Sequence, residues 1–332
     1  MTMAFWALIP ALLALALAQD PPPVYRAASN LVLVDAQVIH NRTKTSAPPL
    51  ERRDLEVYED GVLQEIKYFS RDELPVSVVL LFDLTGTSRR VLWPLAAGAK
   101  NVVTHFKPQD EVAVMAYLDA ARLIGDFTTD RRQTVRDIDR TRRADEEKNT
   151  AAFFNEAVYQ AAMHLRSNGR PGNRRVIIWL TDNLSNVPDE MTRVHLGRNV
   201  PKGELHTEQE ARRALHEAGI MVAPLLAQAP LQLIDRQRMA ADGLWAKFAP
   251  PGDARKYAEW TGGQVTELRG KGVDQRLADL IDELRSTYTI GFQASEGKPA
   301  GTFCKLRVTV APNGRLRPQE WNVLARDGYY RK

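Results

Sequence analysis

Three oxygen-bearing side chains follow a long apolar run in the first half of the chain. The run Val76–Phe82 ends in Asp83, and Thr85 and Thr87 come shortly after it in the sequence VSVVLLFDLTGTS. An apolar run of this length predicts a strand buried on both faces of a parallel sheet, and open α/β sheets bind ligands at the carboxyl ends of such strands. A carboxylate and two hydroxyls are hard oxygen donors, which suit Mg²⁺ or a similar cation and do not suit a soft metal.

A later threonine and a later aspartate could complete such a site. Thr150 lies in KNTAAFFNEAVYQAA, which indicates a loop entering an amphipathic helix, and Asp182 ends a second apolar strand in RRVIIWLTDN. Strand ends of a parallel sheet meet at one edge, so Asp83 and Asp182 are expected to lie together. An ordinary structural role is also open to each residue, because Asp and Thr after a strand commonly cap the next helix.

The D-x-T-x-T run of Asp83, Thr85 and Thr87 resembles the D-x-S-x-S signature of the von Willebrand factor type A domain. In that family a later threonine and a later aspartate complete the metal-ion-dependent adhesion site, and Thr150 and Asp182 are the candidates here. The β-rich segment DLEVYEDGVLQEIKYFSRDELPVSVVLLFD, placed before this domain, resembles exported bacterial proteins with a VWFA-related domain, well known from acidobacteria. Both serines of the family motif are threonines in this chain, which keeps the hydroxyl donors.

This resemblance implies a doubly wound, mostly parallel, Rossmann-like sheet in a non-enzymatic adhesion protein that binds its partner through a divalent cation. The hydroxyls of Thr85, Thr87 and Thr150 would touch the ion, which is expected to be Mg²⁺, with Mn²⁺ or Ca²⁺ as alternatives. Asp83 and Asp182 would often act through water. Because the set carries only two formal negative charges, it leaves the ion with an open position. We expect an acidic side chain of a protein partner to fill that position.

A second interpretation of the same residues is enzymatic. The sequence D-L-T-G-T-S also resembles the D-K-T-G-T motif of P-type ATPases and haloacid dehalogenases, in which the aspartate is a nucleophile toward phosphate. Asp83 would then be phosphorylated. Leu84 stands where that motif has its lysine, and the second strand ends in Asp182 followed by Asn183, which supplies a single carboxylate for Mg²⁺. The sequence contains no H-E-x-x-H, G-x-S-x-G or P-loop motif.

The start of the chain predicts export. Residues 1–18, MTMAFWALIPALLALALA, are uncharged and apolar and end in the small-x-small tripeptide that precedes signal-peptide cleavage. We therefore expect a periplasmic, secreted or envelope protein, with a proline-containing linker at 19–30. The segment has no Lys or Arg, so retention as an N-terminal anchor is the alternative. The sequence shows no other stretch long enough to span a bilayer.

The charged residues and the single cysteine do not predict a nucleic-acid partner or a disulfide. The net charge is +4, and arginines gather in 131–143, RRQTVRDIDRTRR. Acidic residues interrupt and follow this cluster, and no aromatic side chains interleave for base stacking, so a solvated helix face is predicted and nucleic acid is not expected as a partner. Cys304 alternates with charged residues in FCKLRVTV, which predicts a buried, inert thiol.

The pattern along the chain of 332 residues predicts two domains. Short alternating runs fill 31–74, with a hairpin signal at Asp60-Gly61. Strands and helices alternate over 75–286, which predicts a parallel sheet covered on both faces. Alternating strands return over 287–332. Because the parallel sheet should be complete by about Glu267, we expect these late strands to pair with 31–74 in a small β-sandwich-like domain, with the von Willebrand factor A-like domain inserted between them. Two separate β units are the alternative.

Overall fold

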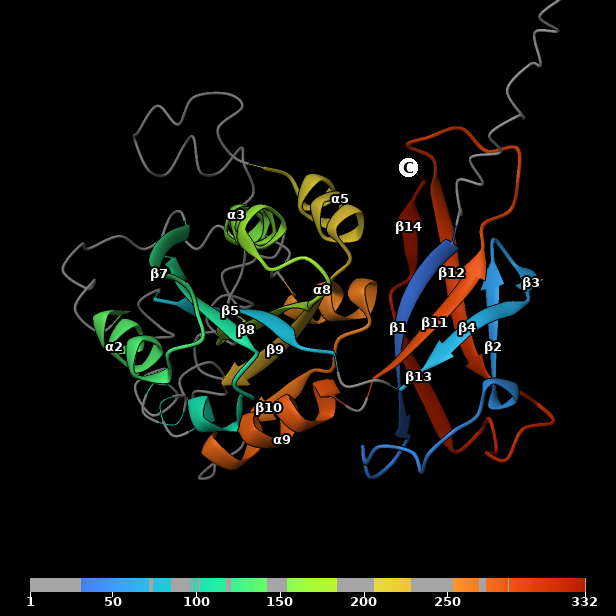
Figure 1. Cartoon of the computed structure of the whole chain (residues 1–332), viewed down its shortest axis with the longest axis horizontal. Coiled ribbons are helices and arrows are strands. Elements are labelled where there is room, and N and C mark those ends of the chain that lie inside the picture. Colours follow the sequence, from blue (N-terminus) through green and yellow to red (C-terminus); the bar gives the residue numbers. More distant parts are fainter. Residues whose placement is uncertain are drawn as a thin grey trace, which may run out of the picture. The chain divides into compact units, whose positions relative to one another are not determined.

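The structure, a computed structural model, describes residues 31–71, 74–84, 96, 98, 100, 102–117, 121–141, 154–183, 206–227, 253–268, 273–285 and 287–331. These residues form a six-stranded central sheet flanked by helices and two four-stranded antiparallel sheets (Figure 1). The predicted fold class is confirmed: a mostly parallel, doubly wound sheet accompanies a smaller all-β domain that is built from both ends of the described chain.

The β domain contains two sheets with the strand orders β13-β1-β11-β4 and β14-β12-β2-β3. All neighbouring strands in both sheets are antiparallel. A short 3₁₀ helix, η1 (Arg52–Asp54), precedes β2. The strands are β1 (Leu31–His40), β2 (Leu55–Glu59), β3 (Val62–Gln64), β4 (Ile66–Ser70), β11 (Tyr288–Gln293), β12 (Phe303–Val310), β13 (Trp321–Ala325) and β14 (Gly328–Tyr330).

A tight turn and a change of sheet shape the first part of this domain. The β2–β3 hairpin turns at Asp60 and Gly61, whose φ angles are 48° and 86°. A two-residue hairpin turn of this kind needs positive φ at both positions, which Asp-Gly accepts. Beyond Glu65 the chain changes sheets, because β3 pairs with β2 whereas β4 pairs with β11. Side chains from both sheets then share one apolar core.

Strand β12 shows how sequence alternation specifies that core. In FCKLRVTV the residues Cys304, Leu306, Val308 and Val310 are buried, while the charged residues between them are exposed. Burial raises the pKa of the Cys304 thiol, which makes it a poor nucleophile near neutral pH. The buried, inert thiol predicted from the sequence is what the structure shows.

The central sheet has the strand order β10-β9-β8-β5-β6-β7, which in chain order is the 3-2-1-4-5-6 arrangement of doubly wound folds. Neighbours are parallel except at the edge, where β7 runs antiparallel to β6. Strands β5, β6 and β9 are buried along their whole length, as their continuous apolar sequences predict. The strands are β5 (Val76–Asp83), β6 (Glu111–Tyr117), β7 (Ala121–Thr128), β8 (Arg174–Thr181), β9 (Ile220–Ala227) and β10 (Thr266–Leu268).

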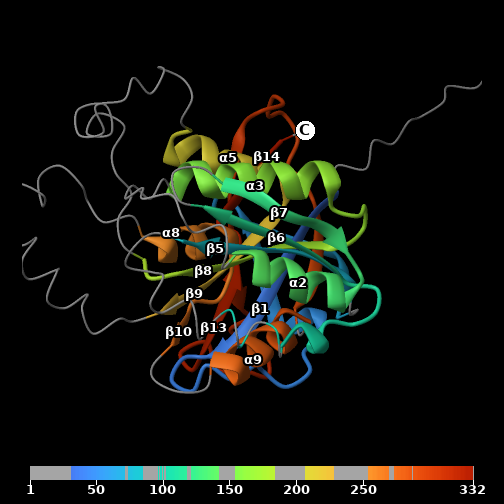
Figure 2. The same cartoon turned by 90° about the vertical axis from the view of Figure 1, so that its left-hand side faces the viewer.

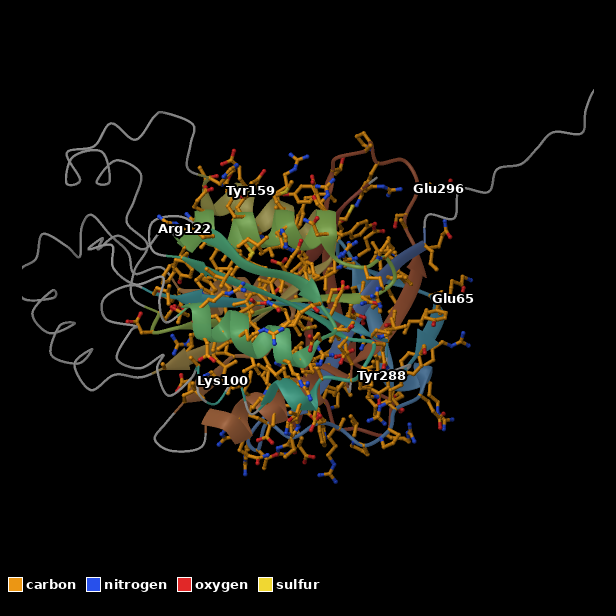
Figure 3. All side chains as sticks on the ribbon, turned by 60° about the vertical axis from the view of Figure 1, so that its left-hand side comes forward. Glu65, Lys100, Arg122, Tyr159, Tyr288 and Glu296 are labelled. Atoms are coloured by element: carbon orange, nitrogen blue, oxygen red, sulfur yellow. The ribbon has the colours of Figure 1, made fainter. Side chains whose placement is uncertain are left out.

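Helices cover both faces of this sheet (Figure 2), and side chains fill the space between the layers (Figure 3). One face packs against α3 (Phe154–Asn168), α5 (Glu208–Ala218) and α8 (Ala254–Thr261). The other packs against α2 (Arg131–Thr141), α9 (Val273–Arg285) and residues beside the 3₁₀ helix η2 (Val103–His105). The predicted helix at 89–106 lies largely outside the described residues.

The termini of α5 follow from its sequence. Thr207 is the N-cap residue, and its side chain accepts a hydrogen bond from the backbone N–H of Glu210. The Glu210 carboxylate in turn accepts the backbone N–H of Thr207, which completes a capping box. Gly219 ends the helix in the left-handed region, with φ of 62°, a conformation that glycine adopts without a steric penalty.

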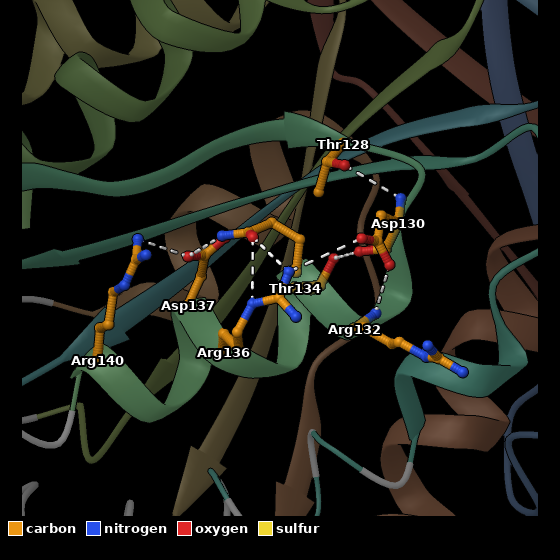
Figure 4. A network of polar contacts seen from close by, with 8 residues as sticks. Thr128, Asp130, Arg132, Thr134, Arg136, Asp137 and Arg140 are labelled. Atoms are coloured by element: carbon orange, nitrogen blue, oxygen red, sulfur yellow. Dashed lines mark hydrogen bonds and ion pairs between the residues drawn. The ribbon is translucent and has the colours of Figure 1, made fainter.

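Helix α2 corrects part of the prediction for the arginine-rich segment. Arg132, Arg136 and Arg140 are exposed, as a solvated helix face requires, but four other positions of the helix are buried: Thr134, Asp137, Ile138 and Thr141. The buried Asp137 carboxylate accepts hydrogen bonds from Gln133 (2.8 Å) and Arg140 (2.9 Å) (Figure 4). It packs against Gly125, where an added Cβ would lie 2.1 Å from Asp137 Oδ2.

The α/β domain is inserted between two neighbouring strands of the β domain. Ser70 at the end of β4 is the direct partner of Thr289 in β11. The intervening chain leaves the β domain after β4 and returns to it at β11. The inserted domain therefore occupies the place of a hairpin loop.

Arg174, the buried first residue of β8, fastens the insertion to the β domain. Its backbone N–H donates to the carbonyl of Pro75, where the chain enters the inserted domain (2.9 Å). Its guanidinium donates to the carbonyl of Thr287, where the chain leaves (3.1 Å), and pairs with Asp35 of β1 (3.2 Å). One residue thus joins both connections and the neighbouring sheet.

A second polar contact joins α5 to the end of the β domain. The buried ring of His216 places Nε2 2.7 Å from Asp327 Oδ1, and its Nδ1 lies 2.8 Å from the carbonyl of Arg212. Arg212 also pairs with Asp327 (2.5 Å) and lies over the Trp260 ring, 4.9 Å from its centroid. Both contacts lie at the amino end of the central sheet, since Arg174 starts β8 and His216 precedes β9.

Candidate functional site

Two buried carboxylates lie at adjacent strand ends on the carboxyl edge of the central sheet. Asp83 is the last residue of β5, and Asp182 directly follows β8; their exposed fractions are 0% and 3%. β5 and β8 are neighbours, with Phe82 opposite Leu180, so Asp83 is level with Thr181. Neighbouring strands lie about 4.8 Å apart, which brings the two aspartates to one place on the edge.

The structure describes two of the five residues predicted to bind the metal. Asp83 and Asp182 come together as their positions at the ends of apolar strands predict. Thr85, Thr87 and Thr150 lie outside the described residues. The two carboxylates are therefore the part of this candidate site that the structure describes.

Hydroxyl groups from neighbouring strands hold the Asp83 carboxylate. The Thr181 hydroxyl donates to Asp83 Oδ2 at 2.7 Å. Tyr117, the last residue of β6, lies directly opposite Asp83 in the strand register. Burial, together with the negative charge of Asp83, raises the pKa of Tyr117 well above its ordinary value, so the phenol keeps its proton. The indole N–H of Trp179 donates to the Tyr117 oxygen at 3.0 Å.

Asn183, the residue after Asp182, links the site to helix α8. Its backbone has a positive φ of 59°, which asparagine tolerates better than most residues. Its backbone N–H donates to the Thr181 hydroxyl (3.0 Å), and its side-chain oxygen accepts the N–H of Ala254 in the first turn of α8 (2.6 Å). Its amide nitrogen donates to Asp253, the N-cap residue of α8 (3.1 Å). The turn after Asp182 is thereby fixed.

The amino end of α3 provides another fixed point near this edge. The buried Glu156 carboxylate accepts the backbone N–H of His206 (2.9 Å) and lies 2.7 Å from its ring Nδ1. Tyr159, labelled in Figure 3, stacks on the His206 ring with centroids 3.4 Å apart. The Tyr257 hydroxyl of α8 donates to Asn155 at 2.6 Å. These contacts tie α3, α8 and the start of α5 together on one face of the sheet.

The sequence motifs do not point to Tyr117, Thr181 or Asn183 as members of the candidate site. Their roles depend on strand register, since Asp83 lies opposite Tyr117 in β6 and level with Thr181 in β8. A hydroxyl residue immediately before a strand-end aspartate is the signal that could have indicated Thr181. No comparable local signal distinguishes Tyr117 from an ordinary core tyrosine.

The chemistry of the described donors fits a hard divalent cation. Carboxylate oxygens are the preferred protein ligands of Mg²⁺ and Ca²⁺, and the predicted partners Thr85, Thr87 and Thr150 would add hydroxyl oxygens. Asp83 and Asp182 are the described residues that would hold such an ion.

A second group of potential metal ligands, in the β domain, does not fit a metal. Carboxylate oxygens of Glu59 and Asp60 and the thiol of Cys304 lie within 4.8 Å of one another. The Lys298 ammonium donates to Asp60 and lies 3.8 Å from the Cys304 sulfur. This cation already balances the acidic group, and Glu59 also accepts a hydrogen bond from the Tyr329 hydroxyl (2.5 Å). The group is a structural network of the β domain.

Comparison with solved structures finds distant likenesses. An aerotolerance-related membrane protein from Bacteroides fragilis, carrying multiple mutations to serine, aligns with a TM-score of 0.42 and 13% identity over 63% of this chain and 98% of that chain. The conserved hypothetical protein BatB from Bacteroides thetaiotaomicron aligns with a TM-score of 0.41 and 14% identity over 62% and 99%. Proximal thread matrix protein 1 from the mussel byssus, with a zinc-occupied MIDAS motif, aligns with a TM-score of 0.39 and 14% identity over 69% and 50%.

Neither the models of known protein families nor the curated proteins give a match to this chain. The fold assignment rests on the strand order and register described above. Among the described residues, no helix has both the length and the apolar character that crossing a membrane requires.

Proposed function

With a von Willebrand factor A-like domain as its central part, we propose that the chain is an exported, non-enzymatic protein that binds a protein partner through a divalent cation. The observation that carries the proposal is the pair of buried carboxylates, Asp83 and Asp182, at adjacent strand ends of the central sheet. Thr85, Thr87 and Thr150 would complete the ligand set with three hydroxyls. Mg²⁺ is the expected ion, and Mn²⁺ or Ca²⁺ could replace it.

The partner is expected to present an acidic side chain to this ion. The proposed ligand set leaves one position on the ion open, and a partner carboxylate supplies an oxygen ligand for that position. The β domain is fastened at the amino end of the sheet through Arg174 and His216. That arrangement leaves the partner-binding edge at the other end of the strands.

Export is supported by the apolar segment 1–18 and its small-x-small end. The mature protein is then expected to begin at Gln19 and to be recovered from the periplasm, the envelope or the medium. Intact-mass measurement of the protein from a fractionated native culture tests this. A soluble cytoplasmic form that keeps Met1 would contradict it.

Metal binding is tested by titrating the mature protein with Mn²⁺, followed by electron paramagnetic resonance, and with Mg²⁺, followed by calorimetry. We expect one site, and we expect Asp83→Asn and Asp182→Asn each to weaken it at least tenfold because each removes a charged oxygen ligand. Asp130→Asn, which changes an exposed aspartate of the same domain, is the matched control and should bind as the wild type does. A wild-type protein with no measurable cation binding at millimolar metal would overturn the proposal.

The phosphoryl-transfer alternative predicts a different result on the same preparation. Asp83 would become covalently labelled by phosphate, or would trap beryllofluoride in the presence of Mg²⁺, and a phosphoester would be turned over. We expect neither. Trapping that is lost in Asp83→Asn would establish the enzymatic function in place of adhesion.

A further inference from the structure

A chain of hydrogen bonds across three adjacent strands has its donors directed at Asp83. Trp179 has an indole N–H and no acceptor, so in its contact with Tyr117 the indole is the donor. The backbone N–H of Asn183 likewise donates to the Thr181 hydroxyl. Each of the two hydroxyls thus already accepts one hydrogen bond from a group that can only donate.

Because both hydroxyl oxygens already accept a hydrogen bond, the hydroxyl hydrogens of Tyr117 and Thr181 are available for donation to a further acceptor. Thr181 donates its hydrogen to Asp83 Oδ2 at 2.7 Å, and Tyr117 lies directly opposite Asp83 on the neighbouring strand β6. The three donating residues Trp179, Tyr117 and Thr181 are each at most 1% exposed and lie within regular strands, so their positions are fixed by packing. The Asp83 carboxylate, which accepts from these fixed donors, is therefore held in one orientation.

We propose that Thr181 and Tyr117 are positioning residues for the metal site: they hold the Asp83 carboxylate in the orientation that binds the cation. This inference rests on the proposed function, since it assigns a role to residues behind a proposed ligand. Thr181 fixes one carboxylate oxygen, and Tyr117 supports both Thr181 and Asp83. Trp179 and Asn183 set the direction of the two hydroxyls.

Asn183 extends this positioning role to the turn that follows Asp182. Because Asn183 donates to Thr181 and also caps α8, the hydroxyl that orients Asp83 is joined through one residue to the backbone that carries Asp182. One connected set of hydrogen bonds therefore fixes both the Asp83 carboxylate and the backbone next to Asp182. Partners of this kind, behind the ligands, typically contribute about 10- to 100-fold in metal affinity.

The test removes each hydroxyl at nearly constant volume. Thr181→Val and Tyr117→Phe should weaken Mn²⁺ binding by about 10- to 100-fold, because Asp83 loses the donors that orient it. Thr181→Ser keeps a hydroxyl and should restore binding to within about twofold of the wild type. The dissociation constant for Mn²⁺ is the readout, and circular dichroism with urea unfolding in chelator reports whether each variant is folded.

Thr261→Val is the matched control, because Thr261 is also a buried threonine of this domain whose hydroxyl accepts a backbone N–H, that of Val222, at 2.9 Å. It lies at the amino end of the sheet, so it should lower stability without changing Mn²⁺ affinity. Folded Thr181→Val and Tyr117→Phe variants that bind Mn²⁺ as tightly as Thr261→Val would overturn the inference. If Thr181→Val fails to fold, Tyr117→Phe decides the question alone. Absence of binding in the wild type would instead overturn the proposed function.

Discussion

Two buried aspartates, one in each domain, are held in different ways. Asp54 in the β domain and Asp83 at the edge of the central sheet are both fully buried. Asp54 accepts hydrogen bonds from the Arg315 guanidinium at 2.6 and 3.0 Å, from the Arg315 backbone N–H at 3.0 Å and from the Glu51 backbone N–H at 2.8 Å. Asp83 is oriented by the neutral hydroxyl of Thr181 and shares its edge with Asp182.

The difference separates a structural carboxylate from one arranged for binding. Asp54 is matched by a full positive charge from Arg315 and joins the two ends of the β domain, since Arg315 lies beyond β12. Asp83 is held in place by groups that orient its oxygens, and a second carboxylate follows on the next strand. A pair of carboxylates at the carboxyl edge of a parallel sheet is suited to a cation supplied from solution.

The largest expected effect on stability is at Asp54. Asp54→Asn should lower the free energy of unfolding by about 2–3 kcal/mol, because the amide places an N–H₂ group against the donors of Arg315 and removes the buried charge that pairs with it. Urea unfolding at pH 7 measures the loss. Glu51→Gln, an exposed neighbour that also pairs with Arg315, should change it by less than about 1 kcal/mol. Equal losses in the two variants would contradict the comparison.

Because of this ion pair, we expect the free energy of unfolding to depend on pH. The Arg315 side chain lowers the pKa of Asp54 to about 2, below its value of 3.8 in an unfolded chain. A lowered carboxyl pKa stabilises the folded state above the unfolded value, so this contribution is present above about pH 4 and is lost as the pH falls toward 2. Because Arg315 is half exposed, we expect the loss to be about 1–2 kcal/mol.

At Glu283 of α9 we expect a smaller change in stability, and with the opposite dependence on pH. Burial, reinforced by the charge of Asp279, raises the pKa of Glu283 from 4.5 to about 7. The folded state therefore holds a proton that the unfolded chain gives up first, and stability falls as the pH rises from about 4.5 to 7. Glu283→Gln should be about 1–2 kcal/mol more stable than the wild type at pH 8 and equally stable near pH 4. Equal urea midpoints at pH 8 would contradict this prediction.

The smallest effect on stability is expected at Asp83, although its effect on binding is the largest. In chelator, Asp83→Asn should change the free energy of unfolding by less than about 1 kcal/mol, because an amide oxygen still accepts the hydrogen bond from the Thr181 hydroxyl. In excess Mg²⁺ the wild type should gain about 2–3 kcal/mol from ligand binding at a hundredfold excess over the dissociation constant, and the variant should not. Urea unfolding with and without Mg²⁺ measures both.

The backbone of both domains could be predicted from local pattern. The continuous apolar run ending at Asp83 predicts a strand buried on both faces, and the alternation around Cys304 predicts one face of a sandwich. Asp83 and Asp182 could also be placed together, because both end such runs and carboxyl ends of parallel strands share an edge. These inferences need only the period of the sequence and the rules of parallel sheets.

The features that could not be predicted from the sequence depend on contacts between residues that lie far apart in the chain. Arg174 starts a strand among other charged residues, and nothing local shows that its guanidinium is buried against the β domain. Asp137 lies in a helix rich in arginine, and it is buried because Gly125, on a neighbouring strand, leaves room for it. Tyr117 becomes part of the site because the register of β5 and β6 places it beside Asp83.

The direct pairing of Ser70 with Thr289 has a consequence for how the chain folds. The β4–β11 pair closes a loop as long as an entire domain, yet each doubling of loop length adds only about 0.6 kcal/mol of closure entropy. That estimate applies to a flexible loop, and a folded insertion whose entry and exit both contact Arg174 has already brought the two strands together. We expect the inserted domain to fold first and to template the β4–β11 pair, so that amides of β5 and β8 gain hydrogen-exchange protection before those of β11.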